Sequence, residues 1–376
     1  MKVLVNALSV SNMSGRHVLL GHLSQLSRWT RGQHEYYVLH HHRNSDLCRD
    51  LGENVRWVNC PPYTSRWASR AVWERIALPH LVTSLKIDFV FMPSGTVAHG
   101  CPVPQISFAQ NPWCLVKGIG RTPSDVPKAA IQRREYRVAM REAAMMVFNS
   151  EYMRSAYREN ADFEERYSEI VYQGIDNTTL ESAAHIAPAI KKDPYSILSV
   201  SAMAPHKGVD TVIKALERLI RQYRLPVRLS LVGPWPDDRY ERKMRNLISE
   251  LRLQDSVKIA GFVSRERLHQ YYAESGIFCL MSQCESFGIP AVEAQAFGTP
   301  VVSSNCCAIP EVCGEGGVYC DHDDIEGVSS ALSTLLTDER EWKRVSAAAV
   351  VNASRFRWDI CSMPLLNMFK VVFSMS

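Results

Sequence analysis

The chain has 376 residues, of which 46% are hydrophobic and 22% are charged, and its formal net charge is +4. This length predicts one large or two medium domains, and these ordinary proportions exclude a disordered, collagenous or coiled-coil chain. No apolar run approaches the roughly 20 residues that a membrane-spanning helix needs, and the first residues indicate a strand rather than a cleaved signal, so we expect a cytoplasmic protein.

Short β-rich runs alternate with longer helical patterns along the whole chain. This alternation predicts parallel sheets with helices on both faces, an α/β architecture of two Rossmann-like, doubly wound domains that face a central cleft. The expected strands are 3–7, 36–39, 55–58, 89–92, 106–108, 145–148 and 170–172, then 196–201, 227–232, 257–260, 277–280, 300–303 and 318–319.

The best candidate for a linker is the stretch 177–188. It is polar and alanine-rich, shows no clear apolar stripe, and is followed by Lys191-Lys192-Asp193-Pro194. Such a stretch between two α/β patterns is typical of a connection between domains. We therefore expect domains at 1–180 and 190–355, with a final helical segment at 356–376.

The eleven cysteines run from Cys48 to Cys361 and lack the spacing of a zinc site or a redox motif. Reduced and mostly buried thiols are expected. The small positive excess lies within residues 1–185. It is compatible with an acidic partner or an anionic membrane surface, but a solvated surface is the simpler explanation.

The most informative stretch is 284–302, which reads as a loop followed by a short helix. Glu285 lies in the loop, Pro290 suits the first helical turn, and Glu293 lies one turn inside the helix. A helix start with Gly288 offers N–H groups and a positive dipole end to a phosphate or a sugar hydroxyl. Two carboxylates beside such a site suit hydroxyl-rich ligands. Taken singly, Glu293 could merely complement the helix dipole, and Glu285 could be a solvated loop residue.

The whole segment resembles the signature of glycosyltransferase family 4, retaining enzymes of the type B fold, in which two glutamates stand either side of seven residues. Ten positions match, from Glu285 to Pro300. Further matches follow in the family's order along about nine tenths of the chain. They are Trp73-Glu74, Asn149-Ser150-Glu151, Gly174-Ile175-Asp176, His206-Lys207-Gly208, Gly261-Phe262-Val263 and Ile309-Pro310-Glu311.

The resemblance implies an N-terminal acceptor-binding domain, a C-terminal donor-binding domain and a last helix that crosses back onto the first. It implies that Lys207 is the cation that faces the donor diphosphate. It also implies that Glu293 binds the two hydroxyl groups of the nucleotide ribose. Glu285, with the backbone at Phe287 and Gly288, would hold the sugar, so Glu285 and Lys207 are the expected catalytic residues. The remaining expected donor contacts are Gly261, Phe262 and Val263 near the base, Ile289 near the nucleoside, and Gly15 through its backbone N–H toward the diphosphate.

Three departures from the family pattern matter. The arginine that usually precedes the lysine is missing, and Arg16, His206 or another cation would have to replace it. The loop before Gly15 has one glycine where two are common. The histidine expected after the fifth strand is replaced by Gln110 and Asn111, which can hydrogen-bond a sugar but cannot act as a base.

The sequence therefore predicts transfer of a hexose from a nucleoside diphosphate sugar to a glycan, a lipid-linked sugar or a small metabolite, as in polysaccharide biosynthesis. The leaving phosphate would help to take the acceptor proton, and neither a cofactor nor a metal is expected. The missing arginine and histidine leave open an inactive or weakly active sugar-nucleotide-binding protein. An epimerase would need further acid and base groups in the site.

Three other patterns have simpler interpretations. Asp321-His322-Asp323-Asp324 precedes a helix and predicts a cap rather than a metal site. The basic and aromatic run from Arg66 to Trp73 is compatible with peripheral contact at the inner face of a membrane, or with an ordinary amphipathic helix. The arginines from Arg133 to Arg141 share one helix face, and nucleic acid is not expected as a partner, while His99 is interpreted as a surface-loop residue.

Overall fold

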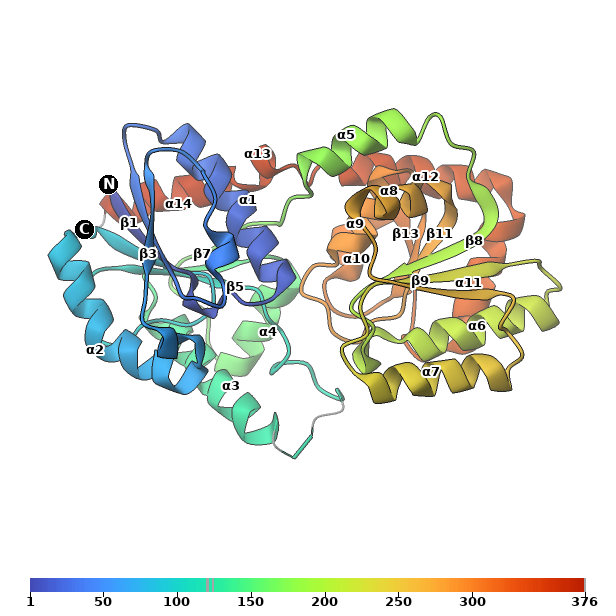
Figure 1. Ribbon diagram of the computed structural model, residues 1–376, viewed down its shortest axis with the longest axis horizontal. Coiled ribbons are helices and arrows are strands. Elements are labelled where there is room, and N and C mark those ends of the chain that lie inside the picture. The colour runs from blue at the N-terminus through green and yellow to red at the C-terminus, as the bar shows by residue number, and fades with distance from the viewer. Residues whose placement is uncertain (120–121, 124, 375–376) are drawn as a thin grey trace. The chain divides into compact units, whose positions relative to one another are not determined.

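The protein is described by a computed structural model that covers residues 1–119, 122–123 and 125–374. Its contacts divide the chain into two compact units (Figure 1). The N-terminal unit comprises the described residues of Met1–Lys117, Arg121–Gly174 and Trp358–Ser376. The C-terminal unit comprises those of Gly118–Gly120 and Ile175–Arg357.

The N-terminal unit is built on a seven-stranded parallel sheet with the order β3-β2-β1-β4-β5-β6-β7. Its central strands are apolar on both faces, as expected for a sheet that helices cover on both sides. The strands are β1 (Lys2–Asn6), β2 (Glu35–His40), β3 (Val55–Asn59), β4 (Phe89–Met92), β5 (Gln105–Ala109), β6 (Met145–Phe148) and β7 (Ser168–Ile170).

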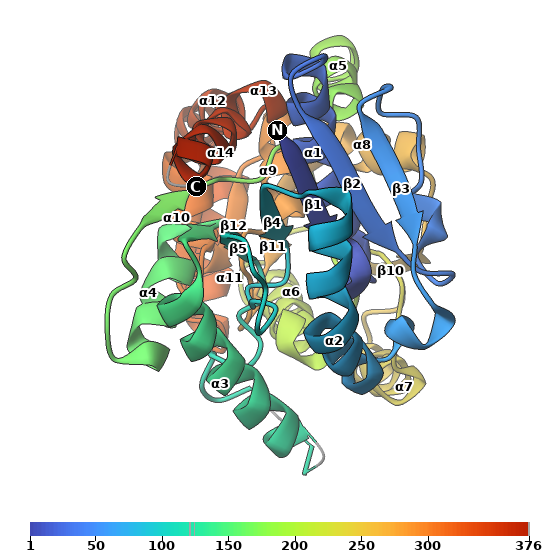
Figure 2. The same ribbon diagram turned by 90° about the vertical axis from the view of Figure 1, so that its left-hand side faces the viewer.

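Successive side chains of β1 point to opposite faces and bury against different helices. Val3 and Val5 pack with α1 (Met13–Trp29) and α14 (Met363–Ser374), whereas Leu4 packs with α2 (Trp67–Leu85). Figure 2 shows α2 apart from α1 and α14 in this unit. The unit also contains α3 (Asp125–Glu142), α4 (Glu151–Ala161), α13 (Trp358–Cys361), η1 (Ala7–Ser9), η2 (Ser45–Leu47) and η3 (Pro62–Ser65).

The C-terminal unit has a six-stranded parallel sheet with the order β10-β9-β8-β11-β12-β13. The same three-two-one-four-five order is the mark of doubly wound nucleotide-binding sheets. The strands are β8 (Asp193–Val200), β9 (Arg228–Val232), β10 (Val257–Gly261), β11 (Ser275–Leu280), β12 (Val301–Ser304) and β13 (Gly317–Cys320).

Two groups of helices cover the faces of this second sheet (Figure 1). One core contains apolar residues of α6 (Val209–Arg221), α7 (Asp238–Glu250), α11 (Ile325–Thr337) and α12 (Glu339–Ala353). The other contains residues of α5 (Asn177–Ile186), α8 (Arg265–Glu274), α9 (Ile289–Ala296) and α10 (Ile309–Cys313). Short 3-10 turns η4 (Pro205–Lys207) and η5 (Gly314–Gly316) complete the unit.

The predicted fold class, with two Rossmann-like doubly wound sheets, is confirmed, and every predicted strand is present with small shifts at its ends. The linker prediction at 177–188 is wrong, because most of that stretch forms α5 and Ala183 is buried in the C-terminal core. The last segment forms two helices rather than one, since α13 ends at Cys361 and α14 begins at Met363, just before Pro364. The last two residues of that predicted segment, 375 and 376, lie outside the described residues.

Candidate donor-binding site

Two loops of the C-terminal unit start where the strand order of its sheet reverses. β8 and β11 are hydrogen-bonded neighbours, and the chain continues from β8 to β9 on one side and from β11 to β12 on the other. Ligands of doubly wound sheets bind beyond the carboxyl ends of the strands at such a switch point. The loop after β8 carries Lys207 and the loop after β11 carries Glu285.

Backbone contacts hold these two loops against each other. The N–H of Gln283 donates to the carbonyl of His206 at 2.8 Å, and the hydroxyl of Ser282 donates to the same carbonyl at 3.2 Å. Gly208 has φ 64°, and a Cβ at this position would lie only 2.1 Å from the carbonyl oxygen of Met281. Glycine is therefore required for both the left-handed conformation and the close approach.

Lys207 and Glu285 form an ion pair across these loops. The Lys207 Nζ donates to the Glu285 Oε1 at 2.5 Å, and the two side chains are 15% and 16% exposed. Unit charges 4 Å apart attract by about 4 kcal/mol at an effective dielectric constant of 20, although loss of hydration offsets much of this. The pair offers an ammonium for an anion and a carboxylate that can accept from hydroxyl groups.

The start of α9 lies directly after Glu285. Gly288 is its N-cap with φ 97°, and a Cβ there would lie 2.3 Å from the Cδ1 of Ile309. Phe287 is buried and packs edge-on against Phe356 at a ring-centroid distance of 5.3 Å, which anchors the turn. Ile289 and Pro290 open the helix and are half-buried. The dipole of α9 therefore starts beside the Lys207–Glu285 pair.

The second glutamate of the motif is held from another helix. The hydroxyl of Tyr272, at the end of α8, donates to the Glu293 Oε2 at 2.9 Å. Burial, followed by the charge and the hydrogen bond of Glu293, raises the pKa of Tyr272 well above its usual value, so this hydroxyl stays a donor. Tyr272 was not identified from the sequence, because its partner is 21 residues away on a different helix.

An exposed aromatic side chain follows β10. Gly261 has φ 67° and accepts through its carbonyl from the N–H of Gly233 at 2.8 Å, which fixes the turn. Phe262 is 77% exposed, whereas Val263 packs against the core on the α8 and α9 side. The predicted base-contact residues thus present one aromatic face to solvent beyond the carboxyl end of a strand.

His206 is the nearest ionisable group in sequence to Lys207 and a candidate replacement for the missing arginine. Burial lowers the pKa of His206, and the charge of Lys207 lowers it further, while Glu285 opposes the shift. The imidazole is therefore neutral at pH 7. The other candidate, Arg16, pairs with Asp46 in the N-terminal unit and also donates to the carbonyl of Arg43 at 3.3 Å.

The predicted residues of the N-terminal unit are held by local partners. The N–H of Gly15 donates to the side chain of Asn12 at 2.7 Å, so the helix cap uses the N–H expected to face a diphosphate. The Gln110 amide donates to the carbonyl of Pro93 at 3.2 Å, and the Asn111 side chain accepts from the N–H of Trp113 at 3.0 Å.

His99, interpreted as a surface residue, is partly exposed. Its Nε2 lies 2.9 Å from a carboxylate oxygen of Glu135, and its Nδ1 lies 3.8 Å from a carboxylate oxygen of Glu142. Both glutamates belong to α3.

A buried polar cluster at the carboxyl end of β1 was not identified from the sequence. The Asn6 amide donates to the Glu74 Oε1 at 2.7 Å, and the Arg70 guanidinium donates to the carbonyl of Leu8 at 2.9 Å. Burial raises the pKa of Glu74, although Asn6 and Arg70 oppose this effect. The available signal was that Glu74 is the one acidic residue of the sequence 67–85.

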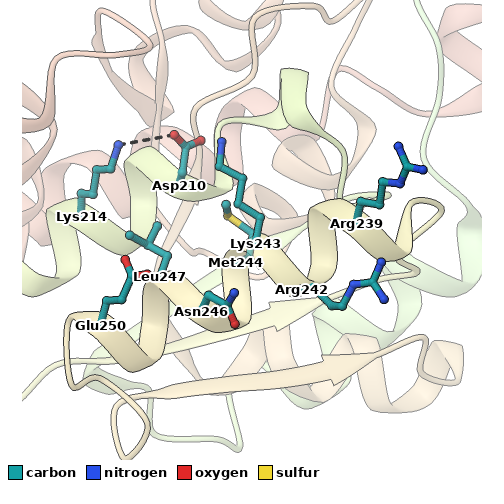
Figure 3. Close-up of a pocket in the computed structure, with 9 residues that line it drawn as sticks. All are labelled: Asp210, Lys214, Arg239, Arg242, Lys243, Met244, Asn246, Leu247 and Glu250. Carbon is teal, nitrogen blue, oxygen red and sulfur yellow. Dashed lines mark ion pairs between the residues drawn. The ribbon is translucent and has the colours of Figure 1, made fainter.

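A surface groove of about 520 Å³ lies elsewhere in the C-terminal unit, between α6 and α7 (Figure 3). Asp210 and Lys214 of α6 are paired at 3.6 Å, and the facing side chains of α7 include Lys243 and Glu250 (Figure 3). Its lining residues come from 210–214 and 239–250, whereas the predicted donor-site residues of this unit come from 207, 261–263 and 285–293. The groove therefore shares no residue with the candidate site.

Two features of the described residues bear on metals and membranes. No group of three or more His, Cys, Asp or Glu side chains in this part of the chain is arranged to hold a metal ion. Within the same residues, no helix combines the length and apolar character needed to cross a bilayer. Asp324 caps α11 by accepting from the N–H of Gly327, as predicted.

Comparison with known proteins agrees with this geometry. Residues 182–350 match the sequence model of the family glycosyl transferases group 1. The O-antigen chain mannosyltransferase B of Escherichia coli is 29% identical over 198 residues, which are 51% of each chain. A D-inositol 3-phosphate glycosyltransferase of Xylanimonas cellulosilytica is 30% identical over 195 residues, covering 51% of this chain and 46% of the relative. The chain thus spans about half the length of the curated relatives it matches.

Solved structures share the fold over nearly the whole chain. Sucrose-phosphate synthase from Thermosynechococcus elongatus aligns with a TM-score of 0.76 at 15% identity and covers 100% of both chains. Anabaena HepE in complex with UDP and glucose aligns with a TM-score of 0.73 at 18% identity, covering 98% of this chain and 99% of HepE. The fold is that of the type B glycosyltransferases. Over residues 182–350, within its C-terminal unit, the chain is similar to the glycosyl transferases group 1 family.

Proposed function

We propose that the protein is a glycosyltransferase that moves a hexose from a nucleoside diphosphate sugar to a hydroxyl group, with retention at the anomeric carbon. The observation that carries the proposal is the Lys207–Glu285 ion pair beside the start of α9, at the switch point of a glycosyl transferases group 1 domain. The names of the relatives, a mannosyltransferase and an inositol phosphate glycosyltransferase, support transfer of a sugar to a glycan, a lipid-linked sugar or a small hydroxylated molecule.

Each residue of the site has a task that its geometry supports. The Lys207 ammonium and the positive end of α9 stabilise the charge that develops on the departing diphosphate. The Glu285 carboxylate accepts from hydroxyls of the donor sugar, and Glu293, oriented by Tyr272, accepts from the ribose hydroxyls. The exposed ring of Phe262 offers a surface on which the base can stack.

The transfer itself needs no protein nucleophile in this proposal. A bond forms between the acceptor oxygen and the anomeric carbon, and the bond from that carbon to the phosphate oxygen breaks on the same face. The acceptor proton passes to the leaving phosphate. The protein contributes positioning and electrostatic stabilisation, and no base is assigned.

The proposal is tested with a panel of nucleotide sugars. UDP-glucose, UDP-N-acetylglucosamine, GDP-mannose and ADP-glucose are each incubated with the protein, and binding is measured by calorimetry. A donor that binds is then tested with hydroxyl acceptors for release of the nucleoside diphosphate, and the anomeric configuration of the product is read by proton NMR. Absence of binding by every nucleotide would contradict the proposal, binding without release would indicate the inactive alternative, and an inverted product would refute retention.

We also propose that the N-terminal unit contacts an anionic membrane surface through exposed side chains of α2. Trp67, Val72 and Ile76 of this helix are 60%, 59% and 62% exposed. Arg66 and Arg75 are exposed on the same segment, whereas Glu74, its single acid, is turned toward Asn6. Exposed apolar side chains close to cations are suited to a negatively charged lipid interface.

Vesicle flotation tests this contact. We expect the protein to float with phosphatidylglycerol vesicles and to stay behind with phosphatidylcholine vesicles. Replacing Trp67 and Ile76 together by serine should abolish flotation. The matched control is Val351→Ser, because Val351 is 70% exposed on α12 of the other unit. Equal flotation of both variants would contradict the assignment.

A further inference from the structure

Three cysteines gather beside the donor-site loop of the C-terminal unit. β11 and β12 are adjacent parallel strands, with Leu280 opposite Ser303. The loop after β11 carries Cys284, directly before Glu285, and the loop after β12 carries Cys306 and Cys307. All eleven cysteines of the chain lie in its described part and are thiols. These three are partly exposed, in contrast to the buried Cys279 and Cys313 of the same unit.

Hydrogen bonds tie the second loop to the first. The Cys306 Sγ donates to the carbonyl of Ser282 at 3.2 Å, and the Cys307 Sγ donates to the carbonyl of Gln283 at 3.2 Å. Ser304 donates to the Ser282 carbonyl as well, at 2.6 Å. Each thiol of this loop is thus held against the two residues that precede Cys284.

The backbone at this point is also unusual. Cys307 has φ 60°, which places a non-glycine residue in the left-handed region. A residue in this region costs on the order of 1 kcal/mol or more, so it persists only where the surroundings hold it. Here the bond from its thiol to the Gln283 carbonyl helps to hold it. The conformation keeps the Cys306 and Cys307 thiols on the side of the β11 loop.

The environment makes Cys306 a reactive thiol. The neighbouring Cys307 side chain lowers the pKa of Cys306 to about 7, with a smaller contribution from Ser304, against the opposing effects of burial and of Cys284. By contrast, burial raises the pKa of Cys60 to about 12. Because the thiolate is the nucleophile, Cys306 is expected to react with oxidants far faster than an ordinary buried cysteine.

We propose that Cys306 and Cys284 form a reversible oxidation site that controls the donor-site loop. A hydroperoxide transfers one oxygen to the Cys306 thiolate, giving a sulfenic acid and releasing the corresponding alcohol or water. The Cys284 sulfur then displaces the sulfenic hydroxyl, which leaves as water, and an S–S bond joins the two loops. The two thiols together lose two electrons and two protons, and the hydroperoxide is the species reduced.

Cys284 is a better partner than Cys307 for chain-geometry reasons. Adjacent residues have Cα atoms about 3.8 Å apart, which is shorter than the roughly 4.4–6.8 Å that disulfides span. A bond between Cys306 and Cys307 would therefore distort the peptide that joins them. Cys284 and Cys306 instead follow two neighbouring strands, β11 and β12, which are about 4.8 Å apart where they pair, so a bond between them does not have to close across a single peptide.

The consequence for the donor site rests on the function proposed above. Cys284 is bonded to Glu285, whose carboxylate faces Lys207 at 2.5 Å. A disulfide at Cys284 fixes the backbone on one side of Glu285 and replaces the thiol contacts that now set the loop. We expect the oxidised protein to bind nucleoside diphosphates at least tenfold more weakly, with full recovery after dithiothreitol.

The disulfide between Cys284 and Cys306 can be mapped without an activity assay. The full-length protein is treated with hydrogen peroxide, blocked with iodoacetamide and cleaved after glutamate. Cleavage after Glu274 and Glu285 releases the peptide 275–285, and cleavage after Glu293 and Glu311 releases 294–311. We expect these two peptides to be linked in the oxidised protein. The link should be absent from Cys284→Ser and from Cys306→Ser but present in Cys48→Ser, a control thiol in the N-terminal unit.

The possible results separate the two proposals. Unlinked peptides, with 294–311 lighter by two hydrogens, would mean a bond between Cys306 and Cys307 and would overturn the assignment of Cys284. Equal reactivity of Cys306 and Cys48 toward iodoacetamide at pH 7 would overturn the reactive thiol. Linked peptides in a protein that binds no nucleotide even when reduced would leave the oxidation site standing and refute the proposed function.

Discussion

Replacing Lys207 by methionine separates the two tasks that the Lys207–Glu285 pair could perform. Methionine keeps most of the length of the side chain and removes its charge. Glu285 is then left only 16% exposed without its cation. Losing one partner of a buried pair costs about 3–5 kcal/mol, and the residual exposure places the expected loss of stability near the lower limit, about 3 kcal/mol. Loss of one group that stabilises the departing charge costs about 2.7–4 kcal/mol in activation, a fall in kcat of roughly 10²–10³.

A double-mutant cycle with Glu285→Gln distinguishes a structural pair from a donor site. The double variant has no unpaired charge, so we expect it to regain most of the stability lost by Lys207→Met. Its activity should stay at least 10²-fold below that of the original chain, because neither the diphosphate cation nor the sugar-binding carboxylate is restored. Stability is read from urea unfolding of the C-terminal unit, and activity from release of nucleoside diphosphate by the donor found in the panel.

The matched control is Lys214→Met, which removes a lysine of α6 that pairs with Asp210 at 3.6 Å on the surface. We expect it to change stability by less than about 1 kcal/mol and to leave the rate unchanged. The reasoning would be refuted if the double variant recovered activity together with stability, since the pair would then be needed only to keep the loops folded.

Three further results are expected. Tyr272→Phe removes the hydroxyl that orients Glu293, so KM for the donor should rise several-fold while kcat changes little, as initial rates would show. Gly208→Ala should lower the urea midpoint far more than Gly32→Ala: both glycines have positive φ, but the new methyl group at Gly208 would meet a backbone carbonyl at 2.1 Å, whereas nothing lies within 4 Å at Gly32. Burial lowers the pKa of His22 to about 3, with a smaller contribution from His17. The unfolded chain therefore binds a proton below pH 6.5 that the folded chain does not, and His22 alone should lower stability by about 2 kcal/mol between pH 6.5 and pH 5. His22→Gln should make the slope shallower by that amount, while His34, whose pKa is lowered to about 4 chiefly by burial, still contributes. An unchanged slope would contradict the assignment.

The strands could be predicted because their signal is contained in each segment. A run such as Phe89–Met92 is apolar at every position, and a strand buried on both faces needs no other information. Helix α5 could not be predicted in the same way. Its buried residues are Thr179 and Ala183, which are too small to form an apolar stripe. Its place depends on distant partners, including the hydrogen bond between Thr179 and His269.

In the candidate site, too, the residues could be predicted from the sequence, whereas the contacts between them could not. The resemblance to a known family was enough to select Glu285, Glu293 and Lys207 as donor-site candidates. The contacts that orient them join residues far apart in the chain, such as Lys207 with Glu285 across 78 positions. Spacing within one segment carries no information on such pairs. At Gly15 a local contact changes the prediction. The side chain of Asn12, three residues earlier, accepts the hydrogen bond from the Gly15 N–H that was expected to face a ligand.

The missing arginine can be understood from the charges around Lys207. In the structure the ammonium already faces one carboxylate, and burial together with that ammonium keeps His206 neutral. A second permanent cation in this partly buried place would repel the Lys207 ammonium, and an uncompensated buried charge is costly. A neutral imidazole avoids this cost, and a bound diphosphate, with its negative charge nearby, would favour its protonation. Under the function proposed above, we therefore expect His206 to gain a proton when the donor binds and so to take the place of the missing arginine.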